Sequence, residues 1–321
     1  MLLDKSKLSK IKGDASLRKF YRKKIGNKKS IIVIATKEKE KNLLIYDAVN
    51  RLLIKNKILA PKLYNETYKK NFIEIEDFGN STIFNILKKK RNNKINLYKK
   101  SVDLLIEIQR IKQNKTKNFK GKNYKIPIYN KAKLFDETKL FLNWYAKKYI
   151  SKDKKLKFDT KIKKQIKFLL SKLKLKNNIF VHRDFHVSNL IMYKKRIAII
   201  DTQDAVIGNK AYDLASLVDD VRLKSSKKFK DHIYNYYLKI SKKQINKDTF
   251  RNDFEILSVL RNMKIIGIFT RLALRDKKNI YLKLIPYTWK LIELRIKSNK
   301  IFNDLKKILD FNFSKEIRKH K

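Results

Sequence analysis

The sequence predicts an α+β fold in two parts: a small strand-rich part over about residues 1–78 and a larger helical part over about residues 79–321. Three observations carry this prediction. Short apolar runs bounded by turn residues dominate the first part. Apolar residues at helical spacing dominate the second. Between residues 180 and 201 the helical pattern gives way to apolar strands around a polar loop.

The first part opens with two strand-like runs, residues 17–22 and 30–35, joined by a Gly-Asn turn. Residues 40–57 carry an apolar stripe at helical spacing, which predicts an amphipathic helix. A further strand is expected over residues 71–78, where apolar and acidic residues alternate. These elements predict a small sheet with a helix against it.

The second part is expected to be mostly helical. Amphipathic patterns cover residues 96–111, 136–150 and 161–175, and long helical patterns return after Tyr212. No internal repeat and no Gly/Ser/Pro-rich linker interrupts the chain, so the sequence predicts a compact body with two lobes.

Composition excludes several function classes. With no cysteine, the chain has no disulfide, no thiolate metal site and no cysteine nucleophile, and its 4 histidines argue against a multi-histidine metal centre. No apolar run approaches the roughly 18 residues that span a bilayer, and the first residues lack the apolar core of a signal peptide. We therefore expect a cytoplasmic protein with no membrane partner.

The formal net charge of +52 has two interpretations. Such a charge suits a surface that binds nucleic acid through its phosphates. However, lysine is scattered along the whole chain, arginine is much rarer, and Ile, Asn and Tyr are abundant while Gly and Pro are scarce. This pattern favours a biased nucleotide composition of the gene, with lysine at ordinary solvated positions, so no specific nucleic-acid partner is expected.

The polar loop between the strands carries the residues that point to chemistry. Asp184 is followed five residues later by Asn189, and Asp201 ends an apolar strand twelve residues further on. Phosphoryl transfer requires positioning groups and metal ions that neutralise phosphate charge, and Mg²⁺ prefers a few protein oxygens together with substrate phosphates. Asn189 and Asp201 are suitable oxygen ligands, and Asp184 is placed to accept the proton of an attacking hydroxyl.

The same segment resembles the kinase superfamily. His182-Arg183-Asp184 with Asn189 matches the kinase catalytic-loop pattern. The additional His186, and Asp201-Thr202-Gln203-Asp204 in place of Asp-Phe-Gly, are similar to the aminoglycoside phosphotransferase and choline kinase branch. The resemblance implies a bilobal protein-kinase-like fold, with a small antiparallel-sheet N-lobe over 1–78 and a helical C-lobe over 79–321. It also implies ATP and Mg²⁺ as cofactors.

Most of the chain resembles bacterial anomeric N-acetylmuramate/N-acetylglucosamine kinases. The matching segments occur in the same order, at residues 13–22, 74–79, 129–131, 144–145, 201–205, 212–217 and 260–276. This resemblance implies transfer of the γ-phosphate of ATP to the anomeric hydroxyl of an amino sugar in peptidoglycan recycling.

The resemblance also assigns roles to residues of this chain. Asp184 is the expected catalytic base, and Asn189 and Asp201 are the expected metal ligands. A loop that covers the nucleotide phosphates is expected to contribute Gly13, Ser16 and Arg18. A hinge that contacts the adenine is expected to contribute Glu76 and Phe78. Supporting roles around the catalytic loop fall to His182, Arg183, His186, Gln203, Asp204 and Asp213.

One feature of protein kinases is missing. The strand over residues 30–35 lacks the lysine that normally pairs with the nucleotide phosphates. Arg18, Arg22 and Lys37 are the candidate replacements.

Two alternatives to an amino-sugar kinase stay open. The first is a kinase for another small alcohol, such as an aminoglycoside, a choline-like compound or a hydroxy amino acid. The second is a non-catalytic, kinase-like protein that binds nucleic acid.

Overall fold

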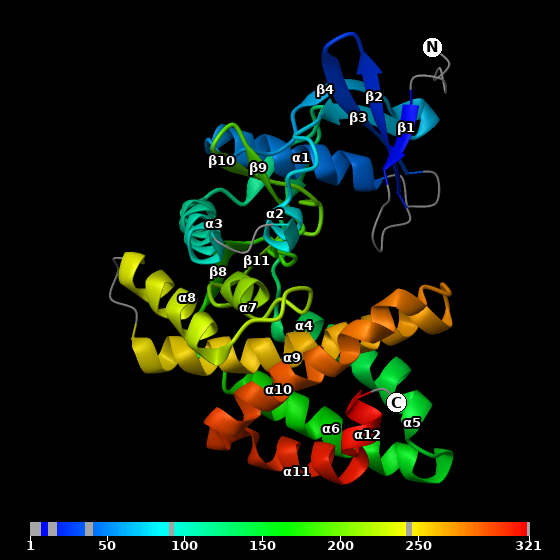
Figure 1. Ribbon diagram of the computed structural model, residues 1–321, viewed down its shortest axis with the longest axis vertical. Helices are drawn as coiled ribbons and strands as arrows, with labels where there is room; N and C mark the ends of the chain where they lie inside the picture. The colour runs from blue at the N-terminus through cyan, green and yellow to red at the C-terminus, as the bar shows by residue number, and fades with distance from the viewer. Residues whose placement is uncertain (1–7, 12–17, 36–40, 90–92, 242–245, 320–321) are drawn as a thin grey trace. The chain divides into compact units, whose positions relative to one another are not determined.

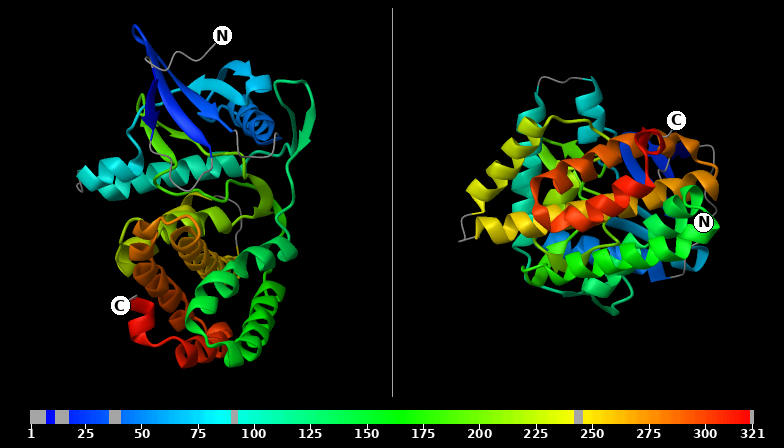
Figure 2. Two further views of the ribbon diagram at one scale, coloured as in Figure 1. Left: turned by 90° about the vertical axis from the view of Figure 1, so that its right-hand side faces the viewer. Right: turned by 90° about the horizontal axis from the view of Figure 1, so that it is seen from below.

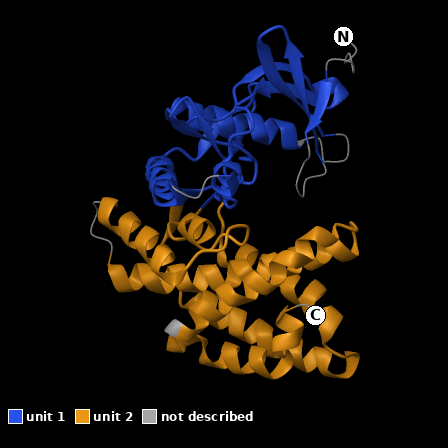
Figure 3. Cartoon of the chain, viewed as in Figure 1, with its two compact units in different colours: residues 1–127, 179–207 blue, residues 128–178, 208–321 orange. Residues whose placement is uncertain are grey.

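In a computed structural model, residues 8–11, 18–35, 41–89, 93–241 and 246–319 are described. The chain forms two compact units (Figure 3). Unit 1 comprises residues 1–127 and 179–207, and unit 2 comprises residues 128–178 and 208–321. Each unit is therefore built from two separate stretches of chain. The lobe boundary predicted after residue 78 is a different division and stays a prediction.

Unit 1 contains an antiparallel five-stranded sheet (Figure 1). Its strand order is β1-β2-β3-β5-β4, with β1 Leu8–Ile11, β2 Lys19–Ile25, β3 Lys28–Ile34, β4 Leu63–Thr67 and β5 Phe72–Glu76. Ile25 pairs with Lys28 across a two-residue turn, and Gly26 in this turn has a φ of +54°, a conformation that glycine adopts without steric cost.

The buried face of the sheet packs against helix α1, Lys41–Lys55 (Figure 2). Ile31 and Val33 of β3 and Ile73 of β5 form a core cluster with Leu43 and Tyr46 of the helix. Apolar residues on alternate positions of β5 and at helical spacing in α1 create this cluster. The strand predicted over 30–35, the helix over 40–57 and the strand over 71–78 are confirmed, with ends shifted by a few residues.

The rest of unit 1 holds two helices, of 7 and 16 residues, and several short strands. Thr82 forms a β-bridge with Ile191 just before α2, and strands β9 and β10 form an antiparallel hairpin. Lys194 and Lys195, in the turn of that hairpin, both have positive φ. The remaining strands pair as β6 with β7 and β8 with β11. The bounds are α2 Ile83–Lys89, α3 Lys94–Gln109, β6 Lys115–Lys117, β7 Asn123–Lys125, β8 Asn177–Val181, β9 Leu190–Tyr193, β10 Arg196–Ile199 and β11 Val206–Asn209.

Unit 2 is helical, and α9, Lys247–Leu274, is its central element (Figures 1 and 2). This helix packs against α10, α7, α4 and a π-helical segment over Phe141–Ala146. The other bounds are α4 Lys131–Thr138, α5 Lys147–Tyr149, α6 Lys152–Ser171, α7 Tyr212–Val218, α8 Lys227–Ile240, α10 Ile285–Ser298, α11 Asn303–Asn312 and α12 Lys315–Lys319.

The single helix predicted over residues 136–150 is wrong. The segment is divided into the end of α4, the π-helical turns over Phe141–Ala146, and α5. The backbone of Leu140 lies so close to α9 that a Cβ atom on Gly267 would sit 2.2 Å from the carbonyl carbon of Leu140. Such an approach requires glycine on α9, and neither partner is evident from helical periodicity.

The α+β prediction is confirmed by the antiparallel sheet of unit 1 and the helices of unit 2. Among the helices of the described residues, none combines the length and apolar character needed to cross a membrane.

Candidate active site

The polar loop predicted to carry chemistry lies in unit 1 between β8 and β9. The β9–β10 hairpin pairs Leu190 with Ile199, and the N–H of Ile200 donates a 3.1 Å hydrogen bond to the carbonyl oxygen of Asn189. Asn189 and Asp201 therefore leave the same end of one hairpin, although twelve residues separate them in sequence. The strand pairing brings the two predicted metal ligands together.

Asp184 and Asn189 are linked within the loop. Nδ2 of Asn189 donates a 3.0 Å hydrogen bond to the carbonyl oxygen of Asp184. The same oxygen accepts from the N–H of His186 at 3.0 Å, and the N–H of Asn189 donates to the carbonyl oxygen of His186 at 2.9 Å. These bonds close a tight turn. The Oδ1 atom of Asn189 accepts no hydrogen bond from the residues that the structure describes, so this oxygen remains available to a ligand.

His182 joins the start of the loop to the end of the hairpin. Its side chain is fully buried, and Nε2 donates a 3.0 Å hydrogen bond to the carbonyl oxygen of Ile200. Burial lowers the pKa of His182, against the opposing effect of the nearby carboxylates of Asp184 and Asp201. The ring is therefore neutral at pH 7 and acts through its hydrogen bond rather than through charge.

Arg183 and His186 also hold the loop. Arg183 has a φ of +73°, and its Nη1 atom donates to the carbonyl oxygen of Asp204 at 3.2 Å and lies 3.6 Å from the Oδ1 atom of Asp204. His186 is buried, and its Nε2 atom lies 3.5 Å from Nδ2 of Asn189. A non-glycine residue at positive φ is strained, and the contacts of Arg183 hold this conformation in place.

Asp201 stands at the centre of a polar network. It has a φ of +63°, and its Oδ1 atom accepts from Nη2 of Arg18 and from Nε2 of Gln203, both at 3.1 Å. Gln203 also donates to Oδ2 of Asp204 at 3.0 Å and accepts from Nη1 of Arg18 at 3.0 Å. Gln203 thus connects the two carboxylates with Arg18.

The second carboxylate oxygen of Asp201 is available. Oδ2 accepts no hydrogen bond from the described part of the chain, and the side chain of Asp201 is 40% exposed. Together with Oδ1 of Asn189 it offers two hard oxygen atoms at one hairpin end. Within the described ranges no three or more His, Asp or Glu side chains gather as a metal-binding cluster. A pair of oxygens fits Mg²⁺, which takes its remaining ligands from phosphates and water.

Helix α1 supports this network through a residue that the sequence did not single out. Oγ1 of Thr202 donates a 2.6 Å hydrogen bond to Oδ1 of Asn50, and both side chains are buried. Asn50 lies on the buried face of α1, where Asp47 is also a buried polar residue. A polar residue within this largely apolar stripe is the one signal in the sequence that marks Asn50.

The predicted nucleotide contacts are distributed over the sheet of unit 1. Gly13 and Ser16 lie outside the described residues, as does Lys37. Arg18 is 6% exposed and reaches Asp201. Arg22 instead forms a bidentate ion pair with Asp77, with Nη2 and Oδ1 3.0 Å apart.

In the hinge predicted around Glu76 and Phe78, the N–H of Glu76 is hydrogen-bonded to the backbone and the side chain of Phe78 lies in the core. The N–H of Glu76 donates to the carbonyl oxygen of Lys62 at 2.8 Å. Phe78 is buried in a cluster with Ile191 and Ala198. The hinge is therefore packed directly onto the hairpin that carries Asn189 and Asp201.

In unit 2, Asp213 is fully buried on α7. The neighbouring α9 is buried along most of its length, and its partly exposed positions recur as one stripe, at Lys264, Ile268, Arg271 and Arg275. Arg261 extends this stripe by one turn and is 5% exposed.

The cations of the stripe differ in their partners. Arg275 is paired with Asp276, with Nε and Oδ1 2.7 Å apart, and Lys264 is paired with Glu137 at 2.6 Å. Nη1 of Arg261 and Nε of Arg271 are buried and lack a hydrogen-bond partner among the described residues.

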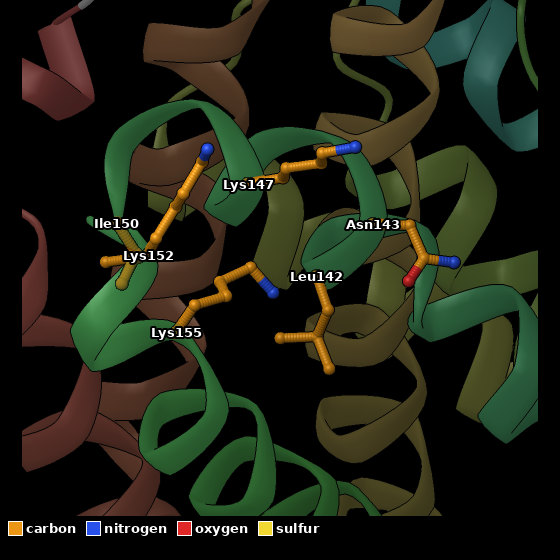
Figure 4. A pocket seen from close by; sticks show the side chains of 6 residues that line it. All are labelled: Leu142, Asn143, Lys147, Ile150, Lys152 and Lys155. Carbon is orange, nitrogen blue, oxygen red and sulfur yellow. The ribbon is translucent and has the colours of Figure 1, made fainter.

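A pocket of about 460 Å³ lies elsewhere in unit 2 (Figure 4). It is lined by Leu142, Asn143, Lys147, Ile150, Lys152 and Lys155. The lining contains no carboxylate, so it supplies neither a general base nor an anionic metal ligand. None of the predicted site residues lies there.

Comparison with known proteins places the chain in a family. The model of the phosphotransferase enzyme family matches residues 7–249. N-acetylmuramate/N-acetylglucosamine kinases of Neisseria meningitidis serogroup B and Pseudomonas aeruginosa are both 25% identical to the chain. The matches cover 85% and 88% of this chain and 80% and 82% of theirs.

Solved structures show the same fold. A choline kinase from Cryptosporidium parvum has a TM-score of 0.61 at 12% identity, covering 97% of this chain and 94% of its own. An amicoumacin kinase in complex with AMP-PNP, Ca²⁺ and Ami has a TM-score of 0.61 at 15% identity, covering 90% of this chain and 88% of its own. These likenesses confirm the kinase-like fold. Since the family match spans most of the chain, the protein belongs to the phosphotransferase enzyme family and is an ATP-dependent small-molecule kinase.

Proposed function

We propose that the protein transfers the γ-phosphate of ATP to the anomeric hydroxyl of N-acetylmuramate or N-acetylglucosamine. The observation that carries the phosphotransfer is the arrangement of Asp184, Asn189 and Asp201 at one end of the β9–β10 hairpin. The amino sugar is supported by the relatives named as N-acetylmuramate/N-acetylglucosamine kinases, whose similarity runs over 85% of this chain.

In this proposal Asp184 is the catalytic base. Its carboxylate accepts the proton of the acceptor hydroxyl while the hydroxyl oxygen forms a bond to the γ-phosphorus. The bond from that phosphorus to the β–γ bridging oxygen breaks, and ADP leaves with the electron pair. The products are ADP and a sugar 1-phosphate. The backbone bonds at the carbonyl oxygen of Asp184 hold the loop in the conformation that presents its carboxylate.

Oδ1 of Asn189 and Oδ2 of Asp201 are the atoms proposed to hold Mg²⁺. When bound, the ion supplies positive charge that neutralises the phosphate oxygens. Gln203 fixes the orientation of the Asp201 carboxylate through its other oxygen, Oδ1. His182 and Arg183 hold the two strand ends that flank the site.

Arg18, together with Gly13 and Ser16, is proposed to contact the nucleotide phosphates. Glu76 and Phe78 are proposed to border the adenine at the hinge. The supporting roles of Asp204, His186 and Asp213, and a cytoplasmic location, stay predictions.

The proposal is tested by a substrate panel in which ADP release is measured with ATP and Mg²⁺. The panel contains N-acetylmuramate, N-acetylglucosamine, an aminoglycoside, choline and a hydroxy amino acid. We expect turnover with the two amino sugars. Turnover confined to the other alcohols would overturn the amino-sugar assignment and leave phosphotransfer standing. Steep salt-dependent RNA or DNA binding without any turnover would instead favour the nucleic-acid binder.

A further inference from the structure

Arg18 is a buried cation beside a carboxylate of the proposed metal site. Its guanidinium is buried, with a side chain only 4% exposed, and it pairs with Asp201 at 3.1 Å across 183 residues of sequence. It also lies 5.7 Å from the ring centre of Phe20 and 6.0 Å from that of Tyr46. Two aromatic rings and two polar partners therefore hold this charge in place.

Other cations of the sheet are engaged elsewhere. The buried run Ile31-Ile32-Val33 of β3 carries no lysine. On β2, Arg22 is paired with Asp77 and Lys23 with Glu74 at 3.0 Å. Among the described residues of β2 and β3, no basic side chain forms an ion pair with Asp201. Arg18, just before β2, is the cation that reaches the acidic end of the hairpin.

The pair has a consequence for the carboxylate. Arg18 neutralises the negative charge of Asp201, which is the anionic ligand in the proposed metal site. A divalent cation at Oδ2 of Asp201 and the guanidinium at Oδ1 would repel each other across one carboxylate. Bound nucleotide phosphates would offset this repulsion, because their negative charge attracts both the divalent cation and the guanidinium of Arg18.

We propose that Arg18 exchanges partners between two states of the protein. Without nucleotide it is the counter-ion of Asp201 and suppresses binding of a free divalent cation there. When metal and nucleotide bind together, Arg18 transfers to the nucleotide phosphates and Asp201 is released to the metal. This inference rests on the proposed function, because it requires a metal–nucleotide site at Asn189 and Asp201. The exchange of partners by Arg18 makes the affinity for the metal depend on bound nucleotide and the affinity for the nucleotide depend on bound metal. This dependence is measured as a coupling free energy between the two ligands.

The test measures binding rather than turnover. Mn²⁺ is titrated into the full-length protein and free Mn²⁺ is followed by electron paramagnetic resonance, first alone and then with AMP-PNP. In Arg18→Gln we expect Mn²⁺ alone to bind about 5- to 10-fold more tightly than in wild type, because Asp201 has lost its counter-ion. We expect the Mn²⁺–AMP-PNP complex to bind at least about 10-fold more weakly, because a phosphate-binding cation is lost. Tighter binding of Mn²⁺ alone together with weaker binding of Mn²⁺–AMP-PNP, in the same variant, distinguishes the exchange from a general loss of charge.

Three further variants make the outcome decisive. Arg18→Lys retains the charge and is expected to keep the affinity for Mn²⁺ alone within about twofold of wild type, which separates charge from packing. Asp201→Asn is expected to abolish the tighter Mn²⁺ binding when combined with Arg18→Gln. Lys120→Gln, which removes one charge from the half-exposed pair with Glu66, is expected to behave as wild type.

The inference is overturned if Arg18→Gln, with a wild-type circular dichroism spectrum, binds Mn²⁺ alone no more tightly than wild type. It is also overturned if Lys120→Gln reproduces the effect, since general charge would then explain it. If wild type binds Mn²⁺–AMP-PNP poorly under every condition, the proposed function fails instead. The two failures are therefore distinct.

Discussion

The side-chain amide nitrogen of Asn189 donates a 3.0 Å hydrogen bond to the backbone carbonyl oxygen of Asp184. This bond fixes the orientation of the Asn189 side-chain amide. In the proposed function, Asn189 therefore has two roles, because it orders the loop of the proposed base Asp184 and supplies an oxygen to the proposed metal site. The two functions can be separated by substitution.

We expect Asn189→Ala to raise the Mg²⁺ concentration needed for half-maximal activity by about 10- to 100-fold, because it removes a ligand oxygen. Asn189→Asp keeps an oxygen but loses the donor to the Asp184 carbonyl, so it should lower kcat while retaining metal binding. Activity titrated against Mg²⁺ measures both effects. Identical metal profiles for the two variants would contradict the assignment.

Gly267 allows α9 to approach the π-helical segment of unit 2. A Cβ atom there would lie 2.2 Å from the Leu140 carbonyl carbon and 2.3 Å from its oxygen. Although alanine is the better helix former, Gly267→Ala should therefore destabilise the protein by about 1–3 kcal/mol. Urea denaturation measures the change, with the exposed Thr160→Ala of α6 as a control that stays close to wild type. A neutral or stabilising Gly267→Ala would refute the close approach.

Asp219 is a fully buried carboxylate in unit 2. It is paired with Arg295 at 2.9 Å and with Lys230 at 3.1 Å, and it accepts from Oγ of Ser258 at 2.6 Å. Burial opposes ionisation, but the two cations outweigh it and hold the pKa of Asp219 well below its usual range. The folded state therefore favours the ionised form.

The sign of the pH dependence follows from that lowered pKa. The stabilisation is fully present above the unfolded-state value of about 4 and is lost as the pH falls through the folded-state pKa. Asp219→Asn should cost about 3–5 kcal/mol at pH 7, since it leaves two buried cations unpaired. The difference in unfolding free energy between wild type and variant should shrink on acidification from pH 5 to pH 3. A difference that stays constant over this range would exclude the ion pair as the cause.

Local patterns in the sequence predicted most of unit 1. The strands at β2, β3 and β5, helix α1 and the strands around the catalytic loop follow from alternation and helical spacing. Asp184, Asn189 and Asp201 can be proposed together from the sequence because they lie within one strand–loop–hairpin segment, where local structure determines which residues meet.

Local sequence patterns do not predict contacts between residues that are far apart in the sequence. The Arg18–Asp201 pair joins residues 183 positions apart, and sequence spacing left Arg18, Arg22 and Lys37 as equal candidates. Only the fold shows that Arg22 is held by Asp77. The break in the helix over 136–150 likewise lies where the backbone of Leu140 approaches Gly267 of α9, more than a hundred residues later in the sequence.

The central claim is that the chain moves a phosphate to an anomeric hydroxyl with Asp184 as the base. The direct measurement is ³¹P NMR of reactions containing ATP, Mg²⁺ and N-acetylmuramate, run with wild type and with Asp184→Asn. We predict an anomeric phosphate signal for wild type and a rate at least about 100-fold lower for the variant. Phosphate on another hydroxyl, or an Asp184→Asn variant as fast as wild type, would contradict the account.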